Sequence, residues 1–203
     1  MGFYLELIRT VFQVIDGQGK LRNRVVAFTS ATPGEGVSYV TNLIARELAA
    51  QTQKRVLLVE AAAFHSLYLG DPKHVSRHCE ETETDNLLTL SAAKSPSMVA
   101  LAGGIRKASD WDSSPEYRAA CLKALRWNFD YVLIDCASPA VSSDATALAP
   151  LIDGVAVVVK AAQTRSAQIQ RCQQMIESSG GNFLGFVLNQ RSYPVPNWIY
   201  RRL

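Results

Sequence analysis

Short apolar runs alternate with amphipathic segments along this chain. The apolar runs, which predict strands, occupy residues 24–29, 55–60, 86–90, 131–135, 154–160 and 183–189. Near-continuous apolar runs of this length are typical of strands covered on both faces in a parallel sheet. Apolar positions recur at helical spacing between most of these runs. The predicted helices span residues 37–48, 114–127, 143–151 and 164–179. The alternation predicts an α/β fold with a mostly parallel sheet and helices on both faces.

The remaining segments lie at the two ends and near the middle. The spacing of Leu5, Ile8, Phe12 and Ile15 predicts an amphipathic helix within residues 1–23, and residues 190–203 form a tail. Residues 61–86 show no clear periodicity, and the acidic run within them is predicted to be a solvated loop. We expect the whole chain, residues 1–203, to form a single domain, because 203 residues can bury one sizeable core.

Composition excludes several functional classes. The net charge of +3 is too small for a dedicated nucleic-acid binder, so no nucleic-acid partner is expected. No apolar run approaches the roughly 20 residues that cross a bilayer, and no export signal is evident. The four cysteines are not spaced as metal-binding or redox pairs. These features predict a cytoplasmic protein with reduced, partly buried cysteines.

The first strand and the helix after it enclose a sequence that resembles a phosphate-binding loop. Residues 30–38 read SATPGEGVS, against the usual spelling G-x-x-x-x-G-K-[ST]. Gly36 and Ser38 occupy the expected places, but Ala31 replaces the first glycine and Val37 replaces the lysine. Loops of this kind surround an anion with backbone N–H groups at a helix N-terminus. The residues expected around a nucleotide are Pro33, Gly34, Glu35, Gly36, Val37, Ser38 and Tyr39.

Two acids end apolar strands and are expected at the same edge of the sheet. Asp135 ends the run at 131–135, and Glu60 ends the run at 55–60. In phosphate-binding sheets an acid in this position holds magnesium opposite the loop hydroxyl, so Ser38 and Asp135 are the predicted magnesium pair. Glu60 has two interpretations, a magnesium contact through water or a strand-end acid that is stabilised by a neighbouring helix N-terminus.

Several motifs in this order resemble the cytoplasmic domain of the bacterial tyrosine kinases, from the ParA/MinD-like branch of P-loop proteins. The resemblance rests on the loop at 30–38 and on the motifs at 55–61, 129–135, 144–145 and 149–155. These kinases work in capsular and exopolysaccharide synthesis. The resemblance implies binding of ATP or ADP with magnesium, autophosphorylation of C-terminal tyrosines and assembly into homo-oligomers. It also implies a transmembrane polysaccharide chain-length (co-polymerase) partner, which would place the protein at the inner face of the membrane.

The sequence departs from this family at the positions that carry chemistry. The loop lysine is Val37, and the second motif, hydrophobic-Asp-x-Asp, reads Glu60 and Ala62 at its two acids. Phe64 and His65 replace the basic pair that follows this motif in the family. Phe12 replaces the last arginine of the oligomerisation motif. In place of the C-terminal tyrosine cluster, the tail has only Tyr193 and Tyr200. The sequence therefore predicts a degenerate homologue with a regulatory or binding role and weak or no ATP binding.

Two other functions stay open at this point. In the first, the chain is an active tyrosine autokinase or ATPase in which Lys160, at the end of the run 154–160, replaces the loop lysine. Asp135 and Glu60 would then be catalytic, and Tyr193 and Tyr200 would be phosphate acceptors. In the second, the chain is a ParA/MinD-like positioning ATPase.

Lys160 and Asn189 each have a structural interpretation beside the functional one. For Lys160 we prefer the structural interpretation, in which it is a strand-end lysine that extends to solvent. Asn189 matches the position at which relatives contact adenine, but a turn asparagine is an equal alternative.

Overall fold

The computed structural model describes residues 24–52, 54–62, 80–81, 87–90 and 115–190. The predicted helix within residues 1–23, most of residues 61–86 and the tail beyond Gln190 lie outside the described residues. The description begins at the first strand of the sheet and includes all the strand ends that were predicted to carry chemistry.

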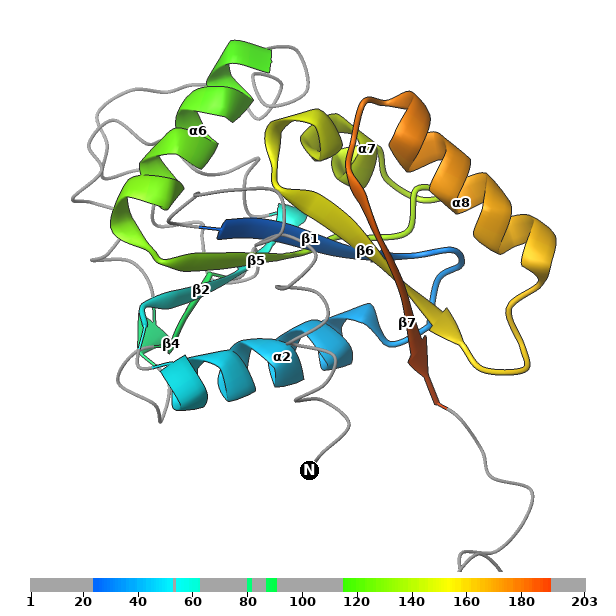
Figure 1. Ribbon diagram of the computed structural model, residues 1–203, viewed down its shortest axis with the longest axis horizontal. Helices are drawn as coiled ribbons and strands as arrows, with labels where there is room; N and C mark the ends of the chain where they lie inside the picture. The colour runs from blue at the N-terminus through cyan, green and yellow to red at the C-terminus, as the bar shows by residue number, and fades with distance from the viewer. Residues whose placement is uncertain (1–23, 53, 63–79, 82–86, 91–114, 191–203) are drawn as a thin grey trace, which may run out of the picture.

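The described strands form one sheet, which is parallel except at one edge (Figure 1). Its strand order is β3-β4-β2-β5-β1-β6-β7, and only the β3–β4 pairing is antiparallel. The predicted, mostly parallel sheet is confirmed. The strands span Arg24–Ser30 (β1), Val56–Glu60 (β2), Glu80–Glu81 (β3), Leu87–Leu90 (β4), Tyr131–Asp135 (β5), Gly154–Lys160 (β6) and Phe183–Asn189 (β7).

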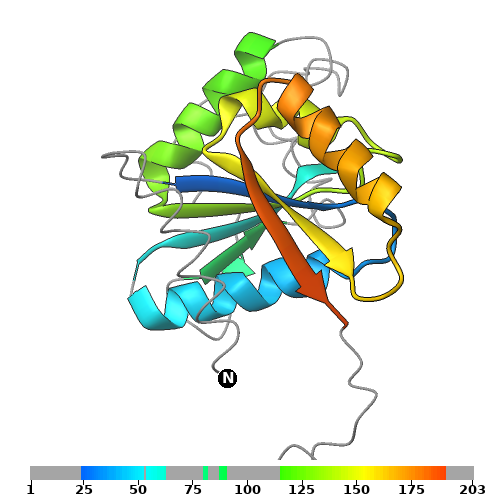
Figure 2. The same cartoon turned by 45° about the vertical axis from the view of Figure 1, so that its right-hand side comes forward.

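Helices cover both faces of the sheet, as predicted (Figure 2). Helix α2 lies on one face, and α6, α7 and α8 lie on the other. The helices span Val37–Thr52 (α2), Pro115–Asn128 (α6), Asp144–Leu148 (α7) and Ser166–Ser178 (α8), and a 3-10 turn, η3, spans Ala149–Leu151.

The predicted elements differ from the observed ones in a few places. The acidic run was expected to be a loop, yet Glu80–Glu81 forms the short antiparallel strand β3 beside β4. Charge argued for a solvated loop, but a strand at the edge of a sheet tolerates acidic residues. The predicted helix at 143–151 is α7 followed by the 3-10 turn η3.

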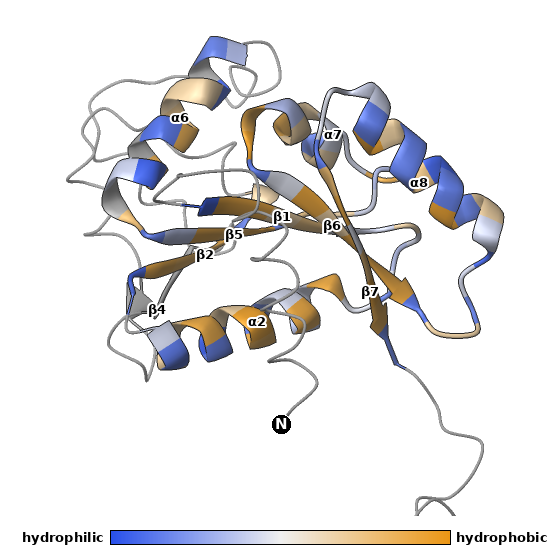
Figure 3. Ribbon diagram, viewed as in Figure 1, coloured by the Kyte–Doolittle hydropathy of each residue, from blue (hydrophilic) through white to orange (hydrophobic). Residues whose placement is uncertain are grey.

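Strand β1 is the centre of the molecule. It pairs in parallel with β5 on one side and β6 on the other, and all seven of its residues are buried. Alternate residues of β1 belong to the two apolar clusters of the core: Val26 and Phe28 pack toward α2, and Val25 and Ala27 pack toward α6 and α7. Figure 3 shows the apolar character of β1, β6 and β7 in orange. The burial on both faces explains the near-continuous apolar runs of the sequence.

The parallel register brings the predicted chemical residues to one edge of the sheet. Asp135 lies beside Phe28 of β1 and beside Glu60 of β2. Ser30 and Lys160 end the neighbouring strands β1 and β6 at the same edge. In open parallel sheets ligands bind outside this carboxyl edge.

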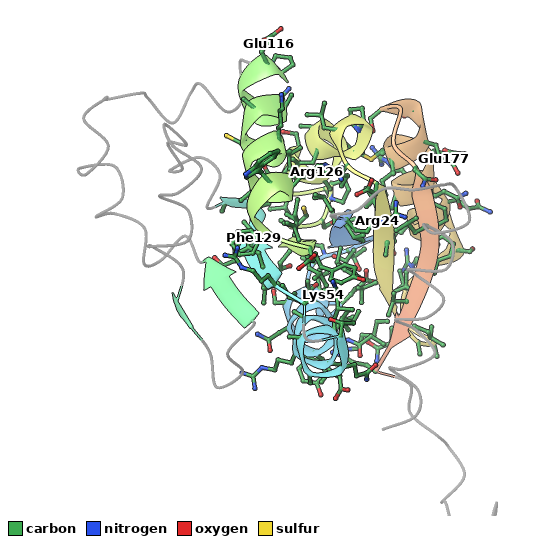
Figure 4. The ribbon with its side chains drawn as sticks, turned by 60° about the vertical axis from the view of Figure 1, so that its left-hand side comes forward. Arg24, Lys54, Glu116, Arg126, Phe129 and Glu177 are labelled. Carbon is green, nitrogen blue, oxygen red and sulfur yellow. The ribbon has the colours of Figure 1, made fainter. Side chains whose placement is uncertain are left out.

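The opposite edge of the sheet is held by a buried carboxylate. Asp153 accepts a hydrogen bond from the Val25 N–H at 2.6 Å and an ion-pair hydrogen bond from Arg126 Nη1 at 2.8 Å. The side chain of Asp153 is 6% exposed and that of Arg126 is 26% exposed. Figure 4 labels Arg126 on α6 together with Arg24 at the start of β1. Asp153 thus joins the end of α6 to the start of the central strand.

Two other sequence-based predictions concern the whole chain. Cys121, Cys136 and Cys172 are buried and are not in disulfides, as expected, while Cys79 lies outside the described residues. Among the described residues, no helix has both the length and the apolar character needed to span a membrane.

Replacing Asp153 should destabilise the protein strongly. We expect Asp153→Ala to lower the free energy of unfolding by about 3 kcal/mol, because it removes the acceptor of the Val25 N–H and the carboxylate of a partly buried ion pair. Asp153→Asn, which keeps an acceptor oxygen, should cost less. Urea denaturation of the two variants beside the wild type measures the difference; equal stability of all three proteins would contradict this role.

Candidate functional site

The phosphate-binding loop connects the end of β1 to the start of α2 in the expected way. Gly34 and Gly36 have φ angles of 83° and 85°. Side chains with a Cβ rarely adopt this left-handed conformation, so the tight turn requires glycine at both positions. Helix α2 starts directly after the loop, with the Val40 N–H donating to the Gly36 carbonyl at 3.0 Å. The loop is therefore a tight turn that leads directly into the N-terminus of α2, the arrangement that anion-binding loops use.

A cavity of about 480 Å³ opens beside the loop. Its wall is formed by the loop, the ends of β2 and β5, and residues 136–144 after β5. Four carboxylate residues contribute to the lining: Glu35, Glu60, Asp135 and Asp144. Among the described residues that line the cavity there is no lysine or arginine. The cavity lies at the carboxyl edge of the sheet, and the charged residues of its described lining are all acidic.

The structure brings together the predicted pair of Ser38 and Asp135. The Ser38 side chain donates a hydrogen bond to the Asp135 carboxylate, and both residues line the cavity. Burial raises the pKa of Asp135 above its ordinary value of 3.8; the bond from Ser38 lowers it, and the charge of Glu60 raises it. The hydroxyl and the carboxylates are ligands that would suit magnesium.

Val37 fills the lysine position with an apolar side chain. Its side chain is 9% exposed and packs in the cluster formed by α2 and the sheet, beside residues such as Phe28 and Val40. The residue also borders the cavity. Ala62 borders the cavity as well, at the position of the second acid of the Asp-x-Asp motif. Two of the positions at which the family pattern places charge, the loop lysine and the second acid of the Asp-x-Asp motif, are therefore uncharged.

The structure separates other predicted residues from the cavity. Tyr39, Lys160 and Asn189 are not among the described residues that line it. Asn189 donates through Nδ2 to the Glu35 carbonyl at 2.9 Å, so it holds the loop from outside the cavity. Tyr39 is 64% exposed on α2. The tail tyrosines, Tyr193 and Tyr200, lie outside the described residues.

Two residues of this site were not singled out as site residues from the sequence. Asp144, at the start of α7, is buried and accepts a hydrogen bond from Ser142 Oγ at 2.7 Å. Ser138 is buried and donates to the Ala31 carbonyl at 3.3 Å, which ties the segment after β5 to the start of the loop. The only sequence signal of Ser138 was its position shortly after the strand that ends in Asp135, whereas Asp144 also belongs to the motif at 144–145.

Comparison with curated proteins finds relatives over nearly the whole chain, although no protein-family model matches. The tyrosine-protein kinase CpsD of Streptococcus agalactiae is 27% identical over 212 residues, which cover 96% of this chain and 84% of the kinase. The succinoglycan biosynthesis transport protein ExoP of Rhizobium meliloti is 30% identical over 183 residues, which cover 83% of this chain and 22% of ExoP.

Solved structures of kinase domains share the fold. The BceF tyrosine kinase domain is 25% identical, with a TM-score of 0.62, and the match covers 88% of this chain and 72% of that domain. The chain is therefore similar to bacterial tyrosine kinases over nearly its whole length. The MinD cell division protein of Aquifex aeolicus, at 17% identity and a TM-score of 0.58, matches 88% of this chain and 72% of its own. The predicted resemblance to the tyrosine kinases and the ParA/MinD-like P-loop fold are both confirmed.

The site contains one further titratable group with a shifted pKa. Cys136, directly after Asp135, is fully buried, and burial raises the pKa of its thiol well above the ordinary value, with the charges of Asp144 and Asp135 adding to the effect. The thiol therefore stays protonated at neutral pH and is not a nucleophile.

The raised pKa of Asp135 has a measurable effect on stability. A raised folded-state pKa favours folding of the protonated form; this stabilisation is complete below the ordinary pKa of 3.8 and is lost as the pH rises through the folded-state value. We expect Asp135→Asn to be more stable than the wild type at neutral pH, because the amide still accepts from Ser38 without a buried charge. The gain should disappear below pH 3.8.

Urea denaturation of the wild type and Asp135→Asn across this pH range measures the effect. Glu60→Gln is the matched control, since it removes the neighbouring charge and should give a smaller gain of the same sign. If Asp135→Asn is less stable than the wild type at neutral pH in the absence of divalent ions, the result contradicts the raised pKa of Asp135.

Proposed function

We propose that this chain is a catalytically inactive member of the tyrosine kinase family, which acts as a binding or regulatory subunit of polysaccharide assembly and binds ATP weakly or not at all. The observation that carries the proposal is the composition of the cavity. Its described lining contains four carboxylate residues and no lysine or arginine, and the position of the loop lysine is occupied by Val37.

Electrostatics make this cavity unfavourable for a triphosphate. Two like unit charges held about 8 Å apart repel by about 2 kcal/mol at an effective dielectric constant of about 20. Magnesium on Ser38 and Asp135 would offset part of this repulsion, but no cationic side chain of the described lining offsets the rest. Phosphate-binding sites normally supply that charge through the loop lysine.

The missing lysine also removes a specific interaction. A hydrogen bond from a charged donor contributes roughly 1.5–3 kcal/mol, so its loss weakens binding by roughly ten- to a hundredfold. Loss of electrostatic stabilisation in the transition state typically slows a reaction by about 10²–10³. The uncharged Ala62 and the longer Glu60 remove or displace two more groups of the family pattern. Phosphoryl transfer at a useful rate is therefore not expected.

The partners follow from the family. A transmembrane polysaccharide co-polymerase would hold this chain at the inner face of the membrane, and further copies of the chain would join it in a homo-oligomer. The name of the relative ExoP, a succinoglycan biosynthesis transport protein, supports a role in polysaccharide export. ATP, ADP and magnesium would be ligands of active relatives in such an assembly.

One competing function is an active autokinase that uses Lys160. Lys160 ends β6 at the carboxyl edge of the sheet and pairs in register with Asn189, which contacts the loop. Lys160 is not among the described residues that line the cavity, and this counts against the autokinase function. The third function, a positioning ATPase, is supported by the shared fold alone.

Restoring the lysine tests the proposal most sharply. We expect isothermal titration of the wild type with ATP and magnesium to show no binding at micromolar concentrations. Val37→Lys should bind at least about tenfold more tightly than the wild type, because it returns a charged donor to the loop. Val37→Met, which adds length without charge, is the matched control and should behave as the wild type. Sub-micromolar binding with turnover by the wild type would overturn the proposal.

A phosphotyrosine assay separates the inactive protein from an autokinase. The wild type incubated with ATP and magnesium should show no signal with an anti-phosphotyrosine antibody. A signal that is abolished in Lys160→Ala, and also in the double variant of Tyr193 and Tyr200 to phenylalanine, would establish the autokinase instead.

A further inference from the structure

A buried carboxylate lies in the middle of the phosphate-binding loop. Glu35 lies between Gly34 and Gly36, and only 2% of its surface is exposed. Buried carboxylates need hydrogen-bond partners, because an unsatisfied buried charge is costly. The partners of Glu35 come from two parts of the chain that are far apart in sequence.

One partner lies in the loop, and the other lies in the turn between β6 and α8. The Thr32 N–H donates to Glu35 Oε2 at 3.0 Å, which closes the loop on itself. The Thr164 hydroxyl donates to Glu35 Oε1. Thr164 Oγ also accepts from the Lys160 N–H at 3.0 Å and lies 3.1 Å from the Lys160 carbonyl, so its single proton has two acceptors, of which the Glu35 carboxylate is the charged one.

The end of β7 holds the same part of the loop through the main chain. Asn189 Nδ2 donates to the Glu35 carbonyl at 2.9 Å, and the Asn189 carbonyl accepts from the Ala161 N–H at 2.9 Å. The approach is so close that a Cβ on Gly36 would lie 2.4 Å from Asn189 Nδ2. The loop therefore rests directly on the ends of β6 and β7.

In each of the two segments that contact the loop, one residue other than glycine has a positive φ angle. Ala162, in the turn after β6, has a φ of 56°, and Gln190, directly after Asn189, has a φ of 53°. Residues other than glycine adopt this left-handed conformation at a cost, so surrounding contacts must hold it. In the β6–α8 turn, the N–H groups of Gln163 and Thr164 both donate to the Lys160 carbonyl, which orients Thr164.

We propose that Glu35, Thr164 and Asn189 form a loop clamp that holds the phosphate-binding loop in its anion-binding shape when no anion is bound. The clamp replaces the contacts that phosphates supply in a loaded loop with contacts from the protein itself. Glu35 and Thr164 are positioning residues, since they act on the loop backbone and not on a ligand. The clamp also couples the loop to the β6–α8 turn, and this inference stands whether or not the chain binds ATP.

Hydrogen exchange of the loop amides tests the loop clamp in the intact chain without ligand. Thr164→Val keeps the shape of the side chain but removes the donor to Glu35. We expect it to increase exchange of the amides of residues 32 and 34–38 by roughly tenfold or more, the effect of losing a hydrogen bond to a charged group. Exchange in β5, on the other side of β1, should stay at the wild-type rate.

The control is Thr146→Val, which removes a threonine hydroxyl that bonds only locally, to the Ser143 carbonyl. It should leave loop exchange unchanged. Two results for Thr164→Val would overturn the proposal. In one, exchange in the loop stays at the wild-type rate; in the other, exchange rises by the same factor in the loop and in β5.

A double-mutant cycle checks that the two side chains act on each other. Glu35→Gln keeps the length of the side chain but loses the charge and one acceptor oxygen, and it should also speed loop exchange. Because Glu35→Gln replaces the charged acceptor of this bond, Thr164→Val should speed loop exchange less in the Glu35→Gln protein than in the wild type. Additive effects of the two substitutions would show independent roles and would contradict the loop clamp.

Discussion

The parallel pairing of β1 with β5 and β6 is the constraint on which the rest of the structure depends. Because β1 is wholly buried between these strands, its end at Ser30 lies at a fixed place beside the end of β5. The loop, the start of α2 and the Ser38–Asp135 hydrogen bond all follow from that placement. The same geometry serves active P-loop proteins, so the scaffold alone does not decide the chemistry.

The chemistry depends on the charges that the scaffold presents. In this chain Val37 packs into the apolar cluster below α2, and the described cavity lining is acidic without a balancing cation. The raised pKa of Asp135 shows the same imbalance, since burial and Glu60 outweigh the bond from Ser38. The loop nevertheless keeps its shape, because Glu35 and Asn189 hold it through contacts within the protein. A retained fold with a reduced ligand site is consistent with all of these features.

Much of the fold could be predicted from the sequence, because burial on both faces leaves long apolar runs such as Gly154–Lys160. The pairing of Ser38 with Asp135 was also predictable, since parallel strands end at one edge. The role of Glu35 was not: its partner Thr164 is 129 residues away, and nothing local marks the contact. Asn189 matched a nucleotide-contacting position, yet in the structure its side chain bonds to the loop backbone. Contacts between distant loops depend on side-chain geometry that periodicity does not encode.

The most direct test of the central claim is a crystal structure of the unaltered protein grown with ATP and magnesium. The account predicts a cavity without a triphosphate, with Val37 packed against the sheet and the Glu35–Thr164 contact in place. A triphosphate bound along the N–H groups of residues 34–38, with magnesium between Ser38 and Asp135, would contradict it.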